Sequence, residues 1–252
     1  MLKTRIMPTL LFKDFGLVKG VGFDSGRRVG PALQSIRVYN LREVDELVFL
    51  DIGATPAGKR PDFQEIDELA DNCFMPMTVG GGVRTIADIR DLLAVGADKV
   101  AINSAAVATP ELIRAGAGEF GTQCIVVSID VRRHDDGRCE VVTQCGKHAT
   151  GRDPIAWARQ AAELGAGEIL LTSIDRDGTM RGYDVKLAHD VAAAVNIPVI
   201  ASGGCGSYAD MADVLAGSRV AAIAAASIFH FTEQTPRAAK DFLAARGVPV
   251  RR

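Results

Sequence analysis

Short runs of β-branched and other apolar residues alternate along the chain with longer segments of helical periodicity. The apolar runs occupy residues 6–12, 46–51, 75–79, 99–102, 124–130, 169–173, 197–201 and 221–224. Segments with the apolar spacing of amphipathic helices lie between them, at residues 85–94, 110–120, 153–164, 185–195, 208–215 and 236–246. This alternation is typical of βαβ units that build a parallel sheet. We therefore expect an α/β protein with eight strand–helix units.

A glycine-rich motif follows two of these runs. Residues 78–83 read TVGGGV and residues 201–206 read ASGGCG, 123 positions later. Gly81 precedes Ser104 by 23 residues, and Gly204 precedes Ser227 by the same interval. Because 123 is close to half of the 252 residues, the sequence predicts an internal two-fold repeat, with half-barrels at residues 1–122 and 123–252. An open sheet needs no such symmetry, so we expect a single (β/α)8 barrel domain.

The two motifs predict two anion sites. A glycine-rich turn that leads into a helix leaves backbone N–H groups available to a phosphate. In a (β/α)8 barrel the loops that follow the strands meet at one end, where the active site lies. We therefore expect a two-ended phosphorylated ligand across the barrel mouth. The residues expected to hold its two ends are Gly81, Gly82, Asn103 and Ser104, and Gly203, Gly204, Ala226 and Ser227.

Composition narrows the class of partner. With 29 basic and 31 acidic residues, the chain carries no electrostatic footprint for nucleic acid or an anionic membrane. The apolar run at the N-terminus is too short for a signal peptide, and no run reaches the roughly 18 residues of a membrane span. We expect a cytoplasmic protein. The five cysteines include no C-x-x-C pair, so neither a disulfide framework nor a metal site is expected, and no cofactor is implied.

Several stretches resemble one known family. They are VKG at residues 18–20, DELVFLDI at 45–52, QCIVV at 123–127, LTSIDRDGT at 171–179 and SIFHF at 227–231. Across essentially the full chain the sequence resembles the HisF family, the cyclase subunit of imidazole glycerol phosphate synthase. The resemblance implies a (β/α)8 barrel that receives ammonia from a HisH-like glutaminase docked on its N-terminal face. That ammonia would cleave and cyclise a bisphosphorylated ribonucleotide at the other end.

Candidate catalytic and binding groups lie at the ends of the predicted strands. Asp130 ends the fifth run, where a carboxylate at the barrel mouth can move protons, and we assign it the catalytic role. The resemblance makes Gly178 a phosphate contact beside Asp177, although Asp177 could instead serve a turn. It also implies that Asp51 contacts a hydroxyl or ring nitrogen. Lys19 would close over a phosphate, although it could equally be an ordinary surface lysine.

One position departs from the family pattern. In the family a second catalytic aspartate ends strand one, where this chain has Leu11. A leucine cannot exchange a proton, and a placed acid–base group contributes about 10²–10⁴-fold to a rate. Asp14 lies three residues further on, about 10 Å along an extended chain, and is a poor replacement. Within the predicted repeat, Leu11 occupies the position that Asp130 holds in the second half.

Charged residues precede the strands at the opposite end of the predicted barrel. Because unpaired buried charges are costly, two cations and two anions at similar heights predict a ring of ion pairs. The resemblance implies that this ring is the gate to an ammonia passage, and the alternative is a plug that only stabilises the fold. The gate residues are Arg5, Glu46, Lys99 and Glu168, and the neighbours expected to contact the partner are Asp45 and Asp98.

Leu11 favours one branch of the family. In the glycosyl amidation-associated branch, the barrel supplies ammonia to a sugar amidotransferase, which forms an acetamidino sugar for surface polysaccharide. We therefore prefer amidation of a nucleotide sugar over the cyclase reaction of histidine biosynthesis. A non-catalytic scaffold that activates a glutaminase is a third hypothesis. A phosphosugar isomerase is a fourth, but it would not need the gate charges.

Overall fold

Eight parallel strands form a closed ring in the computed structural model, which describes residues 3–42 and 44–251. The strands are β1 (Arg5–Lys13), β4 (Leu47–Asp51), β5 (Met77–Gly80), β6 (Lys99–Ile102), β7 (Ile125–Arg133), β10 (Glu168–Ser173), β11 (Val199–Ser202) and β12 (Ala222–Ala225). Each strand pairs in parallel with the next, and the pairing of β12 with β1 closes the ring. The predicted (β/α)8 barrel is confirmed.

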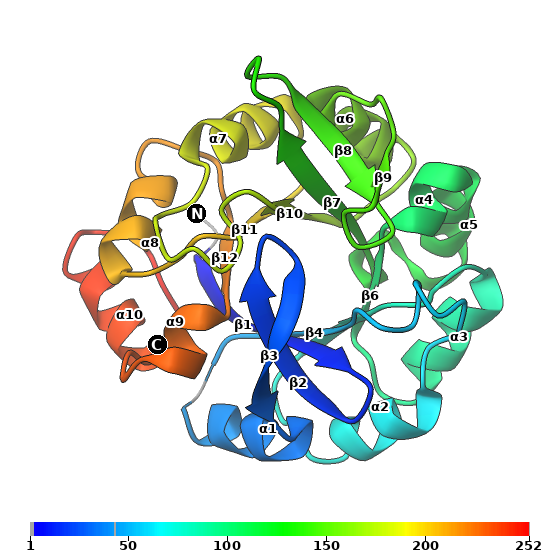
Figure 1. Cartoon of the computed structure of the whole chain (residues 1–252), viewed down its shortest axis with the longest axis horizontal. Helices are drawn as coiled ribbons and strands as arrows, with labels where there is room; N and C mark the ends of the chain where they lie inside the picture. The colour runs from blue at the N-terminus through cyan, green and yellow to red at the C-terminus, as the bar shows by residue number, and fades with distance from the viewer. Residues whose placement is uncertain (1–2, 43, 252) are drawn as a thin grey trace.

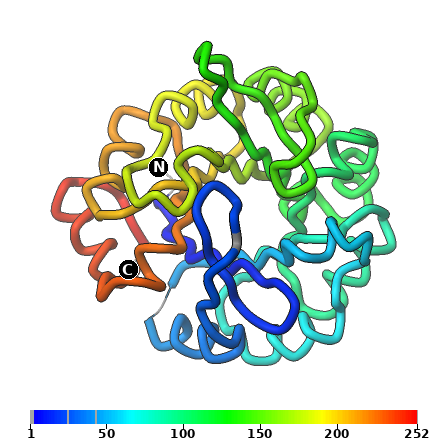
Figure 2. The backbone as a smooth tube through the Cα atoms, in the orientation of Figure 1, coloured from blue at the N-terminus to red at the C-terminus, as the bar shows by residue number. Residues whose placement is uncertain are grey.

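Helices surround the ring on its outside (Figures 1 and 2). They are α1 (Ala32–Leu41), α2 (Phe63–Ala70), α3 (Ile86–Ala94), α4 (Ser104–Ala108), α5 (Glu111–Phe120), α6 (Pro154–Glu163), α7 (Val185–Ala194), α8 (Tyr208–Leu215), α9 (Ser227–Phe231) and α10 (Pro236–Ala244), with a 3₁₀ turn at Thr122–Cys124. Both glycine-rich loops lead into a helix with a reciprocal capping box, Thr85 with Asp88 in α3 and Ser207 with Asp210 in α8. These caps satisfy helix N–H groups and so anchor the ends of the two loops.

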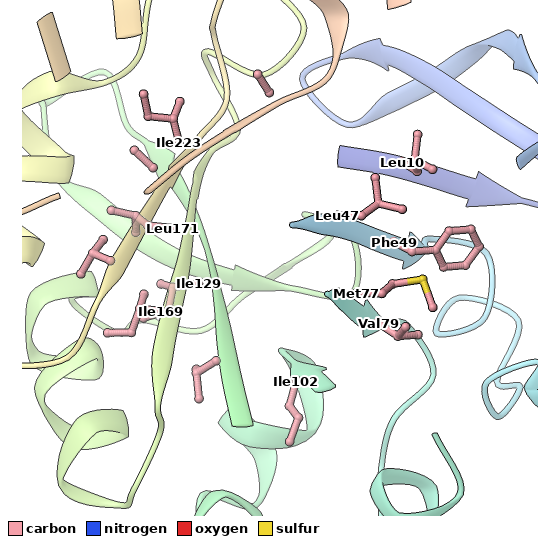
Figure 3. Close-up of a cluster of buried hydrophobic side chains, with 14 of the residues drawn as sticks. Leu10, Leu47, Phe49, Met77, Val79, Ile102, Ile129, Ile169, Leu171 and Ile223 are labelled. Carbon is pink, nitrogen blue, oxygen red and sulfur yellow. The ribbon is translucent and has the colours of Figure 1, made fainter. Parts of the chain in front are cut away.

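Side chains alternate between the two faces of the ring. Every second residue points outward into the core beneath the helices, as Leu10, Phe49, Met77 and Leu171 do in Figure 3. The intervening residues point into the lumen, where the buried apolar cluster consists of Met7, Val48, Ala101, Val126, Leu170, Ile200, Ala222 and Ala224. The two-residue period of a strand produces this separation. The alternation therefore determines which side chains line the lumen and its two ends.

Two antiparallel hairpins extend from the C-terminal ends of the strands. The first comprises β2 (Gly16–Val21) and β3 (Asp24–Gly30), with β2 paired to β1. The second comprises β8 (Cys139–Thr143) and β9 (His148–Ala149), with β8 paired to β7. Both are drawn on the near side of the ring in Figure 1. The sequence analysis did not predict these two hairpins. None of the helices in the described part of the chain is long and apolar enough to cross a membrane.

Candidate functional site

A cavity of about 620 Å³ opens at the C-terminal ends of the strands. It is lined by every residue that the sequence analysis assigned to catalysis or ligand binding, both glycine-rich loops included. These residues are Lys19, Asp51, Gly81, Gly82, Asn103, Ser104, Asp130, Asp177, Gly178, Gly203, Gly204, Ala226 and Ser227. The fold thus brings together residues up to 208 positions apart (227 − 19) in one concave site. Their individual roles stay predictions.

Close backbone approach explains the glycines of the two loops. Gly81 has φ +109°, and a β-carbon there would overlap the backbone oxygen of Asp51. Gly203 has φ +92°, and a β-carbon there would lie 2.6 Å from the Ser173 oxygen. The N–H of Gly82 is not bare, since it donates to the Thr55 hydroxyl at 3.2 Å. Packing alone therefore requires glycine here, and anion binding stays a prediction for these loops.

Asp130 lies in β7 and is positioned by one neighbour. The Asn103 side-chain amide donates to its Oδ2 at 2.7 Å. Burial raises the pKa of Asp130 to about 7, the negative charge of Asp177 adds to the increase, and the Asn103 hydrogen bond opposes it. Asn103 Oδ1 is buried and has no hydrogen-bond partner among the described residues. Near neutral pH, Asp130 can therefore hold or release a proton next to an acceptor that can bind a ligand.

Lys19 and Asp177 form a buried ion pair across the mouth. The Lys19 ammonium lies 2.6 Å from Asp177 Oδ2 and 2.8 Å from Oδ1, and the lysine is 2% exposed. The Gly22 N–H also donates to the Asp177 backbone oxygen at 2.9 Å. The β2–β3 hairpin is thereby tied to the loop after β10. The surface-lysine alternative is wrong, and a phosphate would have to compete with Asp177 for Lys19.

Leu11 lines the same cavity as Asp130. Asp14, by contrast, lies in the exposed turn between β1 and β2, with φ +58°, and is not among the lining residues. Asp51 uses Oδ1 to accept the N–H groups of Gly53 and Ala54, and burial raises its pKa. The strand-one side of the mouth thus has no proton-exchanging group at the position of Leu11.

Three buried hydroxyl residues of the cavity were missed by the sequence analysis. Thr9, Ser128 and Thr172 are at most 9% exposed and line the cavity. Thr9 and Ser128 each lie two positions before a predicted mouth residue, Leu11 and Asp130. Because side chains of a strand share a face at every second position, that spacing was the available signal.

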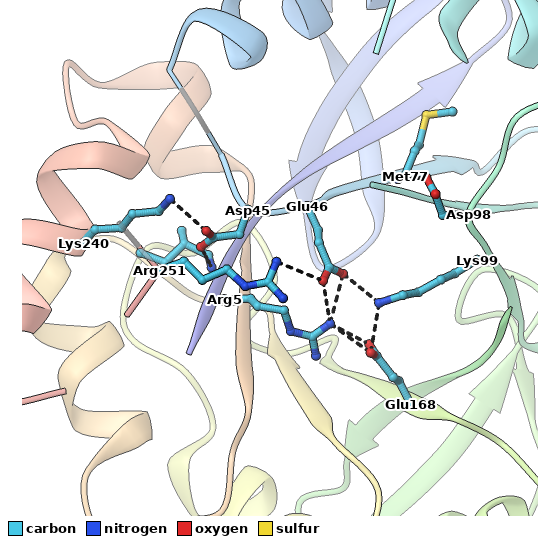
Figure 4. A network of polar contacts seen from close by, with 10 residues as sticks. Arg5, Asp45, Glu46, Met77, Asp98, Lys99, Glu168, Lys240 and Arg251 are labelled. Carbon is cyan, nitrogen blue, oxygen red and sulfur yellow. Dashed lines mark hydrogen bonds and ion pairs between the residues drawn. The ribbon is translucent and has the colours of Figure 1, made fainter. Parts of the chain in front are cut away.

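The four predicted gate residues form a closed ring of ion pairs at the opposite end of the lumen (Figure 4). The Arg5 guanidinium lies 3.0 Å from a Glu46 oxygen and 2.9 Å from a Glu168 oxygen. The Lys99 ammonium lies 2.8 Å from Glu46 and 2.9 Å from Glu168. Burial acts to raise the pKa of Glu46, but the charges of Arg5 and Lys99 outweigh it, and the pKa is lowered. The Glu46 carboxyl therefore stays ionised at neutral pH.

The two predicted partner-contact residues differ in their surroundings. Asp45 is 7% exposed, and its oxygens accept the Ile6 N–H and the Lys240 ammonium, each at 2.9 Å. Asp98 is exposed and accepts the Met77 N–H at 2.8 Å through one oxygen. The carboxylate of Asp45 is thus occupied by contacts within the fold, whereas the side chain of Asp98 is exposed at the surface. Contact of either residue with a partner stays a prediction.

Comparison with known proteins identifies a single family along the chain. A family model described as "Histidine biosynthesis protein" matches residues 5–235. "Imidazole glycerol phosphate synthase subunit HisF" from two strains of Caulobacter vibrioides, NA1000 / CB15N and ATCC 19089, is 49% identical over all 252 residues, and the match covers 97% of each relative. These names favour the cyclase hypothesis, and the preference for sugar amidation finds no support in them.

The close packing of Gly81 leads to a stability prediction. Gly81→Ala should destabilise the protein by about 2 kcal/mol or more, because the new β-carbon strains the backbone and overlaps Asp51. Gly118→Ala is the matched control, since Gly118 is exposed in α5 with no atom near its β-position. We expect it to stabilise by about 0.5–1 kcal/mol. Equal denaturant midpoints for the two variants would contradict the packing argument.

The electrostatics of Asp130 lead to a second prediction. Asp177→Asn should lower the pKa of Asp130 below its value of about 7, because a repelling negative charge is removed. Asp175→Asn removes the same charge from an exposed position of the same loop and should leave that pKa in place. Carboxyl ¹³C NMR titration measures both. Any reaction that needs ionised Asp130 should then persist to lower pH in Asp177→Asn, and an upward or absent shift would refute the assignment.

Proposed function

Because this chain belongs to the histidine biosynthesis protein family, as a HisF-type cyclase subunit of imidazole glycerol phosphate synthase, we propose that it performs the ammonia-dependent cyclase reaction on a bisphosphorylated ribonucleotide. The observation that carries the proposal is Asp130, whose raised pKa suits proton transfer at one end of a lumen closed by charges at the other. The glycine-rich loops would hold the two phosphates, and Asn103 would orient Asp130 and the ligand.

The lower end of the barrel suits a glutaminase partner. The ring of Arg5, Glu46, Lys99 and Glu168 lies at this end of the lumen. A molecule that enters the lumen from this side would therefore meet these four side chains first. Two large apolar side chains near this end are exposed, Leu41 by 86% and Phe74 by 85%. Asn40 links their segments, since its side chain donates to Asn72 and accepts the Phe74 N–H. We propose that a HisH-like glutaminase covers this end and delivers ammonia through the gate.

One observation favours a second candidate function. Leu11 leaves the end of β1 without a proton-exchanging group, whereas cleavage and ring closure require protons to be both given and taken. Ammonia delivery for amidation of a nucleotide sugar, together with a sugar amidotransferase, would not require a carboxylate there. The names of the relatives favour the cyclase reaction, so the amidation role ranks second.

Substitution of Lys99 tests whether the ring of ion pairs controls the transfer of ammonia. In the complex with the glutaminase, Lys99→Ala should lower the ratio of glutamine-supported to ammonium-supported turnover by about 10-fold, the worth of one charged hydrogen-bonded contact. External ammonia reaches the mouth without passing the ring, so the ratio isolates transfer from overall stability. Lys186→Ala, which removes an exposed ion pair with Asp190, is the control. A loss that is equal with both nitrogen sources would make Lys99 structural.

Leu11 tests the choice between the two functions. With ammonium salts and the bisphosphorylated ribonucleotide, we expect slow turnover by the natural chain. Leu11→Asp should raise it by part of the roughly 10²–10⁴-fold that an acid–base group supplies. Leu11→Asn, which is similar in size but cannot exchange a proton, should not. Absence of turnover in both the natural chain and Leu11→Asp would reject the cyclase reaction and favour amidation. Fast turnover by the natural chain would show that one carboxylate suffices.

A further inference from the structure

The cavity at the mouth offers few cations to a ligand with two phosphates. Among the described residues, its lining contains two cations, Lys19 and Arg84, and four carboxyl groups. Lys19 is already paired with Asp177, at 2.6 Å. Carboxylates repel a phosphate dianion, so its binding here requires a cation that is free to meet it. Arg84 is the lining cation that remains.

The Arg84 side chain is held in place without being neutralised. Its Nη2 donates to the backbone oxygen of Lys59 at 2.9 Å. The four other N–H donors of the guanidinium have no partner among the described residues. The carboxylates on the adjoining helix α3 are taken by Arg60, which lies 2.6 Å from Asp88 and 2.9 Å from Asp91. The charge of Arg84 is thus available to a ligand.

Arg84 lies beside the first glycine-rich loop. The Lys59 oxygen that accepts from its guanidinium is only 2.8 Å from the position that a β-carbon of Gly82 would occupy. The backbone N–H of Arg84 donates to Asp88 Oδ2 at 2.9 Å, next to the capping box of α3. These two contacts fix both ends of the residue, so the guanidinium borders the loop that is predicted to hold a phosphate.

The second glycine-rich loop has no counterpart of this side chain. Gly206 occupies the equivalent position, because each residue directly precedes the N-cap of its helix. The Gly206 N–H donates to Asp210 Oδ2 at 2.9 Å, as the Arg84 N–H does to Asp88. A β-carbon at Gly206 would lie 2.3 Å from the Met180 backbone oxygen. The second loop therefore cannot carry a side chain at the position where the first loop carries a cation.

We propose that Arg84 binds a phosphate monoester at the first glycine-rich loop and makes this loop the stronger of the two anion sites. The inference takes its ligand, a bisphosphorylated ribonucleotide, from the cyclase function proposed above. A guanidinium is permanently charged, and its planar N–H donors match two oxygens of one phosphate. The second loop lacks such a cation while Lys19 stays with Asp177. Arg84 thus anchors one end of the ligand and takes no part in proton transfer.

Titration with inorganic phosphate, followed by amide ¹H–¹⁵N NMR, tests the two loops separately. The Kd reported by the Gly82 signal should be lower than that reported by Gly204. Arg84→Gln should raise the Kd at Gly82 about 10-fold, the effect of one charged hydrogen bond, and change the Kd at Gly204 by less than about 2-fold. Arg90→Gln is the matched control, because it removes an exposed guanidinium of α3 that is paired with Glu119. It should change neither Kd.

Three results of this titration would overturn the proposal. The first is an unchanged Kd at Gly82 in Arg84→Gln, or no phosphate binding at Gly82 in the natural chain. The second is an equal rise at Gly82 and Gly204. The third is the same rise in Arg90→Gln, which would reduce the effect to net charge.

Kinetics with ammonium salts separate this proposal from the function on which it rests. Arg84→Gln should raise the KM for the bisphosphorylated ribonucleotide about 10-fold with kcat nearly unchanged, because the contact holds ground state and transition state alike. A lower kcat at unchanged KM would contradict an anchoring role. If phosphate affinity falls as expected but the natural chain does not turn over the ribonucleotide, the cyclase function fails and the Arg84 site stands. If the ribonucleotide turns over and the Kd at Gly82 is unchanged in Arg84→Gln, the function stands and the Arg84 proposal fails.

Discussion

Closure of the eight strands into a ring is the constraint on which the rest of the structure depends. Closure sends every second side chain into a narrow lumen, where a charge can be compensated only by another residue of the ring. Arg5, Glu46, Lys99 and Glu168 meet that requirement with four ion pairs of 2.8–3.0 Å. Each charge contacts both charges of opposite sign, so removing one leaves a buried imbalance. The same geometry keeps the middle of the lumen apolar and confines polar chemistry to its two ends.

The mouth has a different electrostatic balance. Asp130 and Asp177 face one cavity, and the nearby cation, Lys19, is already paired with Asp177. No cation therefore offsets the effects of burial and of the Asp177 charge on Asp130, and its pKa rises to about 7. The Lys19–Asp177 ion pair, which fastens the β2–β3 hairpin, thus occupies the nearby cation, and the pKa of Asp130 stays near neutrality. Binding of a phosphate by Lys19 would change both the hairpin contact and the charge that Asp130 experiences.

The first and fifth strands of the barrel, β1 and β7, place different chemistry at the cavity. Leu11 and Asp130 both line the cavity, and Thr9 and Ser128 lie two residues below them. The strand-five side therefore presents an acid–base group, and the strand-one side presents an apolar side chain above an unsatisfied hydroxyl.

The sequence by itself determined the eight strands, the closed barrel and the set of residues at its two ends. Strand periodicity is local, so predicted runs such as 75–79 and 197–201 differ by only two residues or fewer from β5 (Met77–Gly80) and β11 (Val199–Ser202). The two hairpins were not predicted from the sequence. Only the tertiary structure decided that Lys19 pairs with Asp177, 158 residues away, and that Asp45 is used inside the fold. Ion pairing and the pKa of a buried group depend on which charged groups, distant in sequence, lie close together away from water. No local sequence pattern encodes that proximity.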